Sequence, residues 1–198
     1  MKEDPKLIIP SWDEVYKLLL ELARRAQGRN HPDAIVGIAR GGLVPARVIA
    51  DLLSVQKLGT IGVAFYTDIG RTDKRPRVTQ PLSIDVESQR ILVVDDVADT
   101  GSSLALVVAE LHKSARDLRT AAIYKKPWTK FIPDFYAKET DAWVVFPWER
   151  RETVENIRLR FLDAGRSLVD LQALLVRSGM NRHLAENLIA GIGEAHHK

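Results

Sequence analysis

The chain has 198 residues, of which 45% are hydrophobic and 28% charged, a balance typical of a globular domain and unlike that of a mainly disordered protein. The formal net charge of +3 favours anionic ligands but is too small to predict nucleic-acid binding. The absence of cysteine excludes disulfides, zinc–cysteine sites and thiol nucleophiles. No long apolar run occurs, so neither a signal peptide nor a membrane span is predicted and a cytoplasmic location is expected.

Short apolar strands alternate with amphipathic helices along the first three quarters of the chain. Helices are predicted over 11–28, 43–54 and 102–114, and strands over 34–39, 60–65, 91–95, 120–124 and 143–146. The run at 91–95 is continuous and β-branched, as in the middle of a parallel sheet. This order predicts an α/β domain with a mainly parallel sheet flanked by helices.

Two other segments have a different character. Residues from Tyr66 to Pro81 are polar, charged and interrupted by proline, which predicts a long mobile loop. Near the C-terminus, two amphipathic helices are predicted, with N-caps at Ser167 and Asn181. We therefore expect a main domain over residues 1–150 and a C-terminal helical extension over residues 151–198.

The most informative segment is "ILVVDDVADTGSSLALVVAEL", residues 91–111, which predicts a strand, a loop of small residues and a helix. Such a loop suits an anion, because the unpaired amides of the first helical turn point outward. The residues that suit a phosphate are Ala98, Thr100, Gly101, Ser102 and Ser103. Carboxylates repel phosphate, so Asp95 and Asp96 are expected to accept sugar hydroxyls or to help hold Mg²⁺. The order predicts a ribose beside its 5′-phosphate.

Other interpretations of this segment fit its context less well. The letters "DTGSS" also surround the catalytic aspartate of pepsin-like proteases, but those enzymes need two such aspartates on β-rich lobes. Receiver domains place paired acids at a strand end without "ADTGSS" after them. Neither "GxxxxGK" nor "GxGxxG" is present. A strand–loop–helix phosphate site is therefore the favoured interpretation.

The stretch "VVDDVADTGSSL" resembles the phosphoribosyl-pyrophosphate (PRPP) signature of type I phosphoribosyltransferases. The resemblance implies that Asp95 and Asp96 contact the ribose hydroxyls, with Mg²⁺ nearby. It assigns Ala98 to Ser103 to the 5′-phosphate, and in the purine branch it makes Asp99 the acid or base that faces N7 of the purine. A type I phosphoribosyltransferase fold with a small hood is therefore expected.

A second segment, "VGIARGGLVPARV", offers an arginine and several backbone amides, which suit a pyrophosphate. It resembles the pyrophosphate loop of the same family, in which a cis peptide precedes the basic residue, here Ala39–Arg40. The resemblance implies pyrophosphate contacts from Ala39, Arg40, Gly41 and Gly42. Tyr66 falls where the family carries a flexible loop that closes over the reactants.

The segment 124–149, "YKKPWTKFIPDFYAKETDAWVVFPWE", resembles the purine-binding hood of xanthine-guanine and archaeal purine phosphoribosyltransferases. The resemblance implies that Trp143 stacks on the purine, that Val144 presents backbone groups to its edge, and that Glu149 lies near the exocyclic position or a magnesium-bound water. Lys126 matches the lysine that donates to O6 of a 6-oxopurine; a slip of one residue would exchange it with Lys125.

Two features of the sequence favour different bases, a 6-oxopurine and adenine. Lys126 favours a 6-oxopurine, because a lysine only donates and O6 accepts. The helical extension resembles that of archaeal adenine phosphoribosyltransferases, and this led us to expect adenine, with AMP as product. The resemblance also implies a homodimer whose substrates are PRPP and a purine. A competing class is a PRPP-sensing regulator whose tail binds DNA, but the segment 150–198 carries too little positive charge to favour it.

Overall fold

The computed structural model describes residues 4–28, 31–67 and 74–193 of the chain. These residues form two compact units, and each is described separately below. The sheet unit comprises residues 15–140, and the terminal unit comprises residues 1–14 together with 141–198. Within the described residues, no helix is long and apolar enough to cross a membrane.

The sheet unit is built on a six-stranded sheet of order β4-β3-β2-β5-β6-β7. The strands are β2 (Ala34–Ala39), β3 (Leu58–Thr67), β4 (Lys74–Gln80), β5 (Arg90–Ala98), β6 (Asp117–Lys125) and β7 (Phe135–Glu139). All neighbouring pairs are parallel except β3 and β4. The expected mainly parallel sheet is therefore confirmed.

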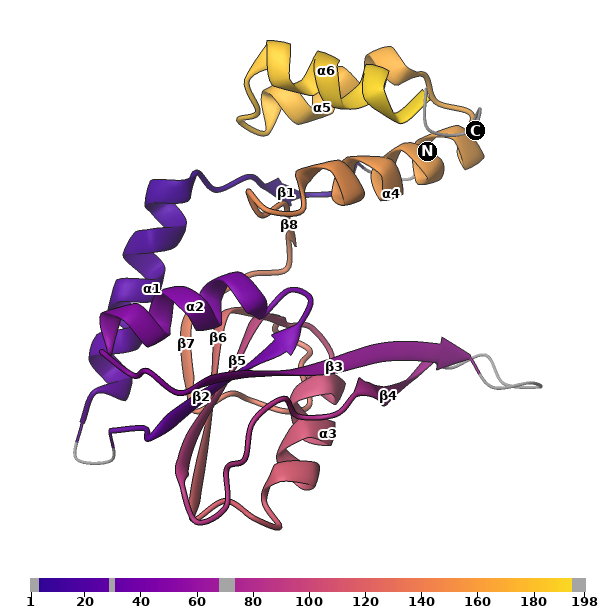
Figure 1. Ribbon diagram of the computed structural model, residues 1–198. Helices are drawn as coiled ribbons and strands as arrows, with labels where there is room; N and C mark the ends of the chain where they lie inside the picture. Colours follow the sequence, from indigo (N-terminus) through magenta and orange to yellow (C-terminus); the bar gives the residue numbers. More distant parts are fainter. Residues whose placement is uncertain (1–3, 29–30, 68–73, 194–198) are drawn as a thin grey trace. The chain divides into compact units, whose positions relative to one another are not determined.

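Helices cover both faces of this sheet (Figure 1). The helices of the sheet unit are α1 (Trp12–Ala26), α2 (Leu43–Leu52) and α3 (Ser102–Leu111), with α2 and α3 on opposite faces. The even-numbered residues Val36 and Ile38 pack in one cluster with Leu104 and Val107 of α3. On the other face, Gly37 admits α2, because a Cβ at this position would lie 2.9 Å from that of Ala46. Burial on both faces explains the continuous apolar runs of β2 and of residues 91–94 in β5.

The expected long loop from Tyr66 to Pro81 is largely a β-hairpin instead. Tyr66 lies in β3 and pairs with Arg75 of β4, and this hairpin extends beyond the rest of the sheet (Figure 1). Pro76 is tolerated because β4 is the edge strand. The proline and the charges, read as loop signals, are features that an exposed edge strand also permits. Residues 68–73, which were expected to belong to the loop, lie outside the described residues.

The terminal unit combines a small sheet with three helices. Strand β1 (Leu7–Ile8) pairs in parallel with β8 (Trp143–Val144), and α4 (Arg150–Asp163), α5 (Leu168–Arg177) and α6 (Arg182–Gly193) follow. The strand expected over 143–146 thus ends at Val144 and pairs with β1 rather than in the six-stranded sheet. The N-terminal segment is tied to the helices through Asp4, whose carboxylate accepts hydrogen bonds from Arg166 and Arg177.

A separate hydrophobic core holds the three helices of the terminal unit together. Its buried members include Val145, Ile157, Phe161, Leu171 and Leu175. The helix starts are those predicted from the sequence: Ser167 and Asp170 form a capping box, and the Asn181 side chain accepts from the amide of Leu184. The apolar faces of the predicted helices therefore pack in one core, to which Val145 before the extension also contributes.

Candidate active site

The two predicted substrate loops meet where the direction of the sheet's connections reverses. Strands β2 and β5 are neighbours, but the chain leaves β2 for β3 on one side and leaves β5 for β6 on the other. In open α/β sheets, a crevice forms at this switch point, at the carboxyl ends of the strands. The loop after β2 and the loop after β5 therefore flank the same crevice.

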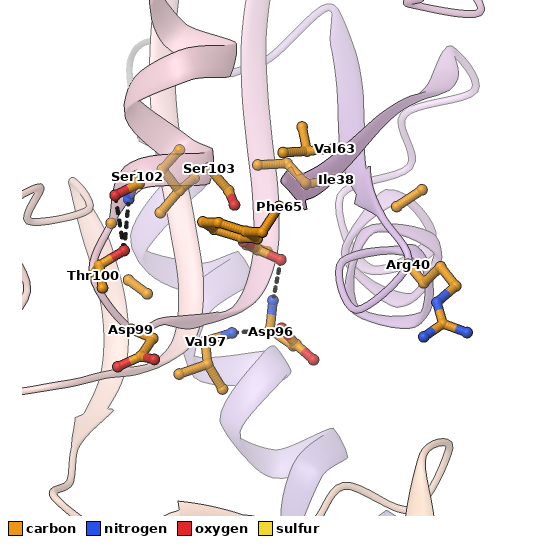
Figure 2. Close-up of a pocket in the computed structure, with 15 residues that line it drawn as sticks. Ile38, Arg40, Val63, Phe65, Asp96, Val97, Asp99, Thr100, Ser102 and Ser103 are labelled. Atoms are coloured by element: carbon orange, nitrogen blue, oxygen red, sulfur yellow. Dashed lines mark hydrogen bonds between the residues drawn. The ribbon is translucent and has the colours of Figure 1, made fainter. Parts of the chain in front are cut away.

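A cavity of about 610 Å³ occupies this position (Figure 2). It is lined by Ile38, Ala39, Arg40, Val63, Phe65, Asp95, Asp96, Val97, Ala98, Asp99, Thr100, Gly101, Ser102, Ser103 and Leu104. The structure thus brings together every predicted ribose-phosphate residue and the predicted pyrophosphate residues Ala39 and Arg40. The apolar side chains come mainly from β2 and β3. The polar ones come from the end of β5, the following loop and the start of α3, except Arg40, which follows β2.

The acidic pair lies within β5 rather than after it. Asp95 is 9% exposed, and its Oδ1 accepts a hydrogen bond from the amide of Asp96 at 3.0 Å. Asp96 Oδ1 in turn accepts from the amide of Val97 at 2.7 Å. These backbone bonds hold both carboxylates in the wall of the cavity, where they can accept from hydroxyl groups.

The loop after β5 turns sharply into α3. Gly101 has φ +77°, and a Cβ there would lie 2.6 Å from the Cβ of Phe131, so only glycine fits without strain. The hydroxyls of Thr100 and Ser102 are 2.8 Å apart, and the amide of Ser102 lies 3.3 Å from the Thr100 hydroxyl. Two hydroxyls and one amide at the helix start thus lie close together, an arrangement that suits a phosphate.

The loop after β2 lies directly against β5. The peptide bond between Ala39 and Arg40 is cis, as the family resemblance implied. A Cβ on Gly42 would lie 2.3 Å from the carbonyl oxygen of Val94, and a Cβ on Gly41 would lie 2.4 Å from Asp96 Oδ2. The two glycines therefore allow the close approach that places Arg40 at the edge of the cavity (Figure 2).

A third loop, residues 126–131, is hydrogen-bonded to the loop after β5, which we call the phosphate loop (residues 98–103). The amides of Lys126 and Lys130 donate to the carbonyl oxygens of Ala98 and Thr100 at 3.0 and 3.1 Å. The indole nitrogen of Trp128 donates to Asp99 Oδ1 at 2.8 Å. Sequence reasoning missed Trp128: its only signal is the "KPWT" turn, which does not reveal what the indole contacts.

The two candidate lysines have different partners. Lys125 forms an ion pair with Glu139, and its Nζ lies 5.0 Å from the ring centroid of Tyr136. Lys126 is 7% exposed, and its Nζ lies 5.5 Å from the ring centroid of Trp128, which itself contacts Asp99. The side chain of Lys126, rather than that of Lys125, therefore belongs to the group of residues around Asp99.

The other predicted purine-binding residues belong to the terminal unit. Trp143 is half-buried in β8, and the guanidinium carbon of Arg160 lies 4.6 Å from its ring centroid. Val144 is buried beside it in the same strand, and Glu149 directly precedes α4. Whether these three residues join the cavity of the sheet unit stays a prediction.

Comparisons with known proteins identify the family of the chain. The profile of the family described as "Phosphoribosyl transferase domain" matches residues 10–152. Xanthine-guanine phosphoribosyltransferases from Cereibacter sphaeroides and Idiomarina loihiensis are 34% and 30% identical, over 70% of this chain and 84% of each relative. The crystal structure of a purine phosphoribosyltransferase from Pyrococcus horikoshii is 36% identical, with a TM-score of 0.65 over 72% of this chain and 93% of that one.

The fold and the cavity define a nucleotide-forming enzyme of the α/β class. The chain belongs to the phosphoribosyl transferase family, and it is an enzyme of the type I, purine-using branch of that family. Helices α5 and α6 and most of α4 lie beyond residue 152, the last that the family profile matches.

Proposed function

We propose that this protein transfers the ribose 5-phosphate group of PRPP to a ring nitrogen of a 6-oxopurine, with release of pyrophosphate. One observation carries the proposal: two carboxylates, a phosphate-binding helix start and an arginine loop line one cavity at the switch point of the sheet. A phosphorylated ribose needs hydroxyl acceptors beside amide donors, and a leaving pyrophosphate needs a nearby positive charge. The cavity offers all three.

The residues have distinct roles in this reaction. Ala98 to Ser103 bind the 5′-phosphate, Asp95 and Asp96 accept from the ribose hydroxyls, and the segment from Ala39 to Gly42 binds the pyrophosphate. As the bond between C1 of the ribose and the pyrophosphate oxygen breaks, its electron pair leaves with the pyrophosphate. The purine nitrogen supplies the electron pair of the new bond to C1, and Asp99 accepts the proton that the purine loses.

Magnesium would be held mainly through the substrate. Among residues 4–28, 31–67 and 74–193, no group of three or more metal-ligating side chains lies together. Asp95 and Asp96 nevertheless place carboxylate oxygens, which Mg²⁺ prefers, in the same cavity wall as the phosphate loop. These two residues fit a metal that completes its ligands with PRPP oxygens. When bound, it would neutralise charge on the leaving pyrophosphate.

Two observations favour a 6-oxopurine over the adenine that the helical extension led us to expect. Lys126 Nζ lies 5.5 Å from the ring centroid of Trp128, which contacts Asp99, so Lys126 is the lysine beside the proposed proton acceptor and the better candidate to donate to O6. The curated relatives described above are xanthine-guanine phosphoribosyltransferases. The amino group of adenine donates at the position of O6, so a charged lysine would reject it. The family resemblance also assigns Trp143, Val144 and Glu149 of the terminal unit to the purine.

The test is pyrophosphate release with PRPP and Mg²⁺, with xanthine, guanine, hypoxanthine and adenine offered separately. The expected result is turnover with at least one 6-oxopurine and none with adenine. The matched variant Asp99→Asn removes the proton acceptor and should lower kcat without weakening PRPP binding. Turnover with adenine alone would overturn the base assignment. Tight PRPP binding without turnover of any base would instead favour the PRPP-sensing regulator.

The assembly state is a separate part of the proposal. We expect a homodimer, on the resemblance to the family, and sedimentation equilibrium of the full chain tests it. A monomer at concentrations where the enzyme is active would contradict it.

A further inference from the structure

We propose that Trp128 is a positioning residue for the reaction: its indole N–H fixes the Asp99 carboxylate so that one defined oxygen faces the purine. This inference rests on the proposed function, because it takes Asp99 as the group that accepts the purine proton. It adds a residue to which the sequence pattern assigned no role.

The contact is a direct hydrogen bond between a neutral donor and a carboxylate. Trp128 Nε1 lies 2.8 Å from Asp99 Oδ1. An indole N–H only donates and does not titrate in the ordinary pH range, so it cannot compete for the proton that the carboxylate must take. With Oδ1 held by the indole, Oδ2 is the oxygen left for the purine. The arrangement follows the general pattern in which a third group orients a catalytic base.

The backbone fixes the position of the indole. The amide of Thr129 donates to the carbonyl oxygen of Lys126 at 3.1 Å, which closes a four-residue turn with Pro127 and Trp128 at its centre. Proline is favoured at the second position of such a turn. The same loop bonds to the phosphate loop on both sides of Asp99, at Ala98 and at Thr100. Backbone hydrogen bonds thus hold the turn next to Asp99 independently of the indole.

Packing alone does not explain a tryptophan here. Trp128 is 53% exposed, so much of its ring surface remains in contact with water. Two of its contacts are with charged groups: the hydrogen bond to Asp99 and the approach of Lys126 Nζ to 5.5 Å from the ring centroid. Trp128 therefore touches both side chains to which the proposed function assigns the purine, the proton acceptor and the O6 donor.

The kinetic test compares Trp128→Phe with Trp12→Phe. Phenylalanine keeps a flat ring beside Lys126 but removes the N–H, whereas Trp12 is similarly exposed, at 54%, and makes its ring contact with Trp148. Losing one hydrogen bond to a charged group should lower kcat for the preferred purine by about 10-fold in Trp128→Phe, with the KM for PRPP unchanged. Trp12→Phe should match the wild type. Unchanged kcat in Trp128→Phe would overturn the inference.

A double-mutant cycle shows whether Trp128 acts through Asp99. In an Asp99→Ala background, Trp128→Phe should have no further effect on the residual rate, since the oxygen that it orients is gone. Equal effects in both backgrounds would mean that Trp128 acts by another route and would contradict the proposal.

A spectroscopic test needs no turnover and so separates this inference from the proposed function. The indole N–H signals in a ¹⁵N-labelled sample can be assigned by Trp→Phe substitution. Asp99→Ala should shift the Trp128 signal and leave those of Trp12 and Trp148 in place. A Trp128 signal that does not move would show that the hydrogen bond is absent, whatever the activity. If the signal moves but no purine is turned over, the contact stands and the proposed reaction fails.

Discussion

Gly41 lies so close to Asp96 that a Cβ on the glycine would come within 2.4 Å of the carboxylate oxygen Oδ2. This close approach joins the loop after β2 to strand β5, because Gly41 belongs to the loop and Asp96 to the acidic pair of the strand. The position of a proposed ribose ligand thus depends on a side chain being absent from the pyrophosphate loop.

Gly41→Ala should therefore damage binding more than folding. The added methyl group pushes the Asp96 carboxylate out of place, and losing its hydrogen bonds should weaken PRPP binding by at least about 10-fold. Calorimetric titration of PRPP checks this, and thermal unfolding checks that the chain still folds. PRPP affinity equal to that of the wild type would contradict the prediction.

Two other glycines provide controls for this variant. In Gly42→Ala, the Cβ would meet the backbone of Val94 at 2.3 Å, so the strand itself must move and the free energy of unfolding should fall by about 1–3 kcal/mol. In Gly191→Ala, nothing lies within 4 Å of the new Cβ, and the change in helix α6 should leave PRPP affinity unaltered.

The two adjacent lysines should respond differently to the same change. Lys126→Ala removes the proposed O6 donor and should lower kcat/KM for 6-oxopurines by about 10- to 100-fold, because the purine loses a hydrogen bond to a charged group. Lys125→Ala breaks the pair with Glu139 and should leave the kcat/KM ratio between purines unchanged. Steady-state kinetics of both variants with each purine measures these kcat/KM values. The opposite result would assign O6 recognition to Lys125.

The sequence predicted the polar residues of the cavity but neither its apolar wall, such as Val63 and Phe65, nor the contacts that fix the polar residues. Asp95, Asp96 and the segment 98–103 could be predicted because strand, loop and helix start follow one another along the chain. Gly41 and Asp96 are far apart in sequence, and so are Trp128 and Asp99. Their contacts depend on strand order, and the sequence alone does not give the neighbour of each strand.

The strands that the sequence analysis did not predict are short or lie at the edges of the sheet. β7 carries charged residues at its end, β4 contains Pro76, and β1 has two residues. None of the three shows the continuous apolar run that identified β2 and β5, because none is buried on both faces along its length. Helices α5 and α6 were predicted because Ser167, Asn181 and the apolar spacing are local signals, whereas α4 was not predicted as a separate helix.

The helical extension should influence purine binding through Arg160. Its guanidinium lies over one face of the Trp143 ring, so a stacked purine would use the other face. Arg160→Ala removes the cation–π contact and should raise the KM for the purine by about 3-fold, while the KM for PRPP stays constant. Arg151→Ala, which removes a hydrogen bond to the carbonyl oxygen of Gly191, is the matched control on the same helix. Equal purine KM values in the wild type, Arg160→Ala and Arg151→Ala would show that Arg160 does not affect purine binding.

The stability of the protein in acid should depend on Asp33. Hydrogen bonds from Arg90, at 2.9 Å from its amide and 3.0 Å from its Nε, hold the pKa of the Asp33 carboxyl well below its ordinary value. Because the pKa is lower in the folded state than in the unfolded state, the carboxylate stabilises the fold above about pH 4. This stabilisation is lost as the pH falls from there toward the pKa of the folded state.

Asp33→Asn removes this titration, so the melting temperature of the variant should fall less steeply below pH 4 than that of the wild type. Unfolding followed by circular dichroism from pH 7 to pH 2 measures the difference. Asp51→Asn is the control, because Asp51 pairs with Arg47 at 3.6 Å and both side chains are exposed. Asp33→Asn should lie below the wild type near neutral pH, where the ion pair with Arg90 is lost, and approach it in acid. Parallel curves of melting temperature against pH for the wild type and Asp33→Asn would show that the Asp33 carboxylate does not contribute to acid unfolding.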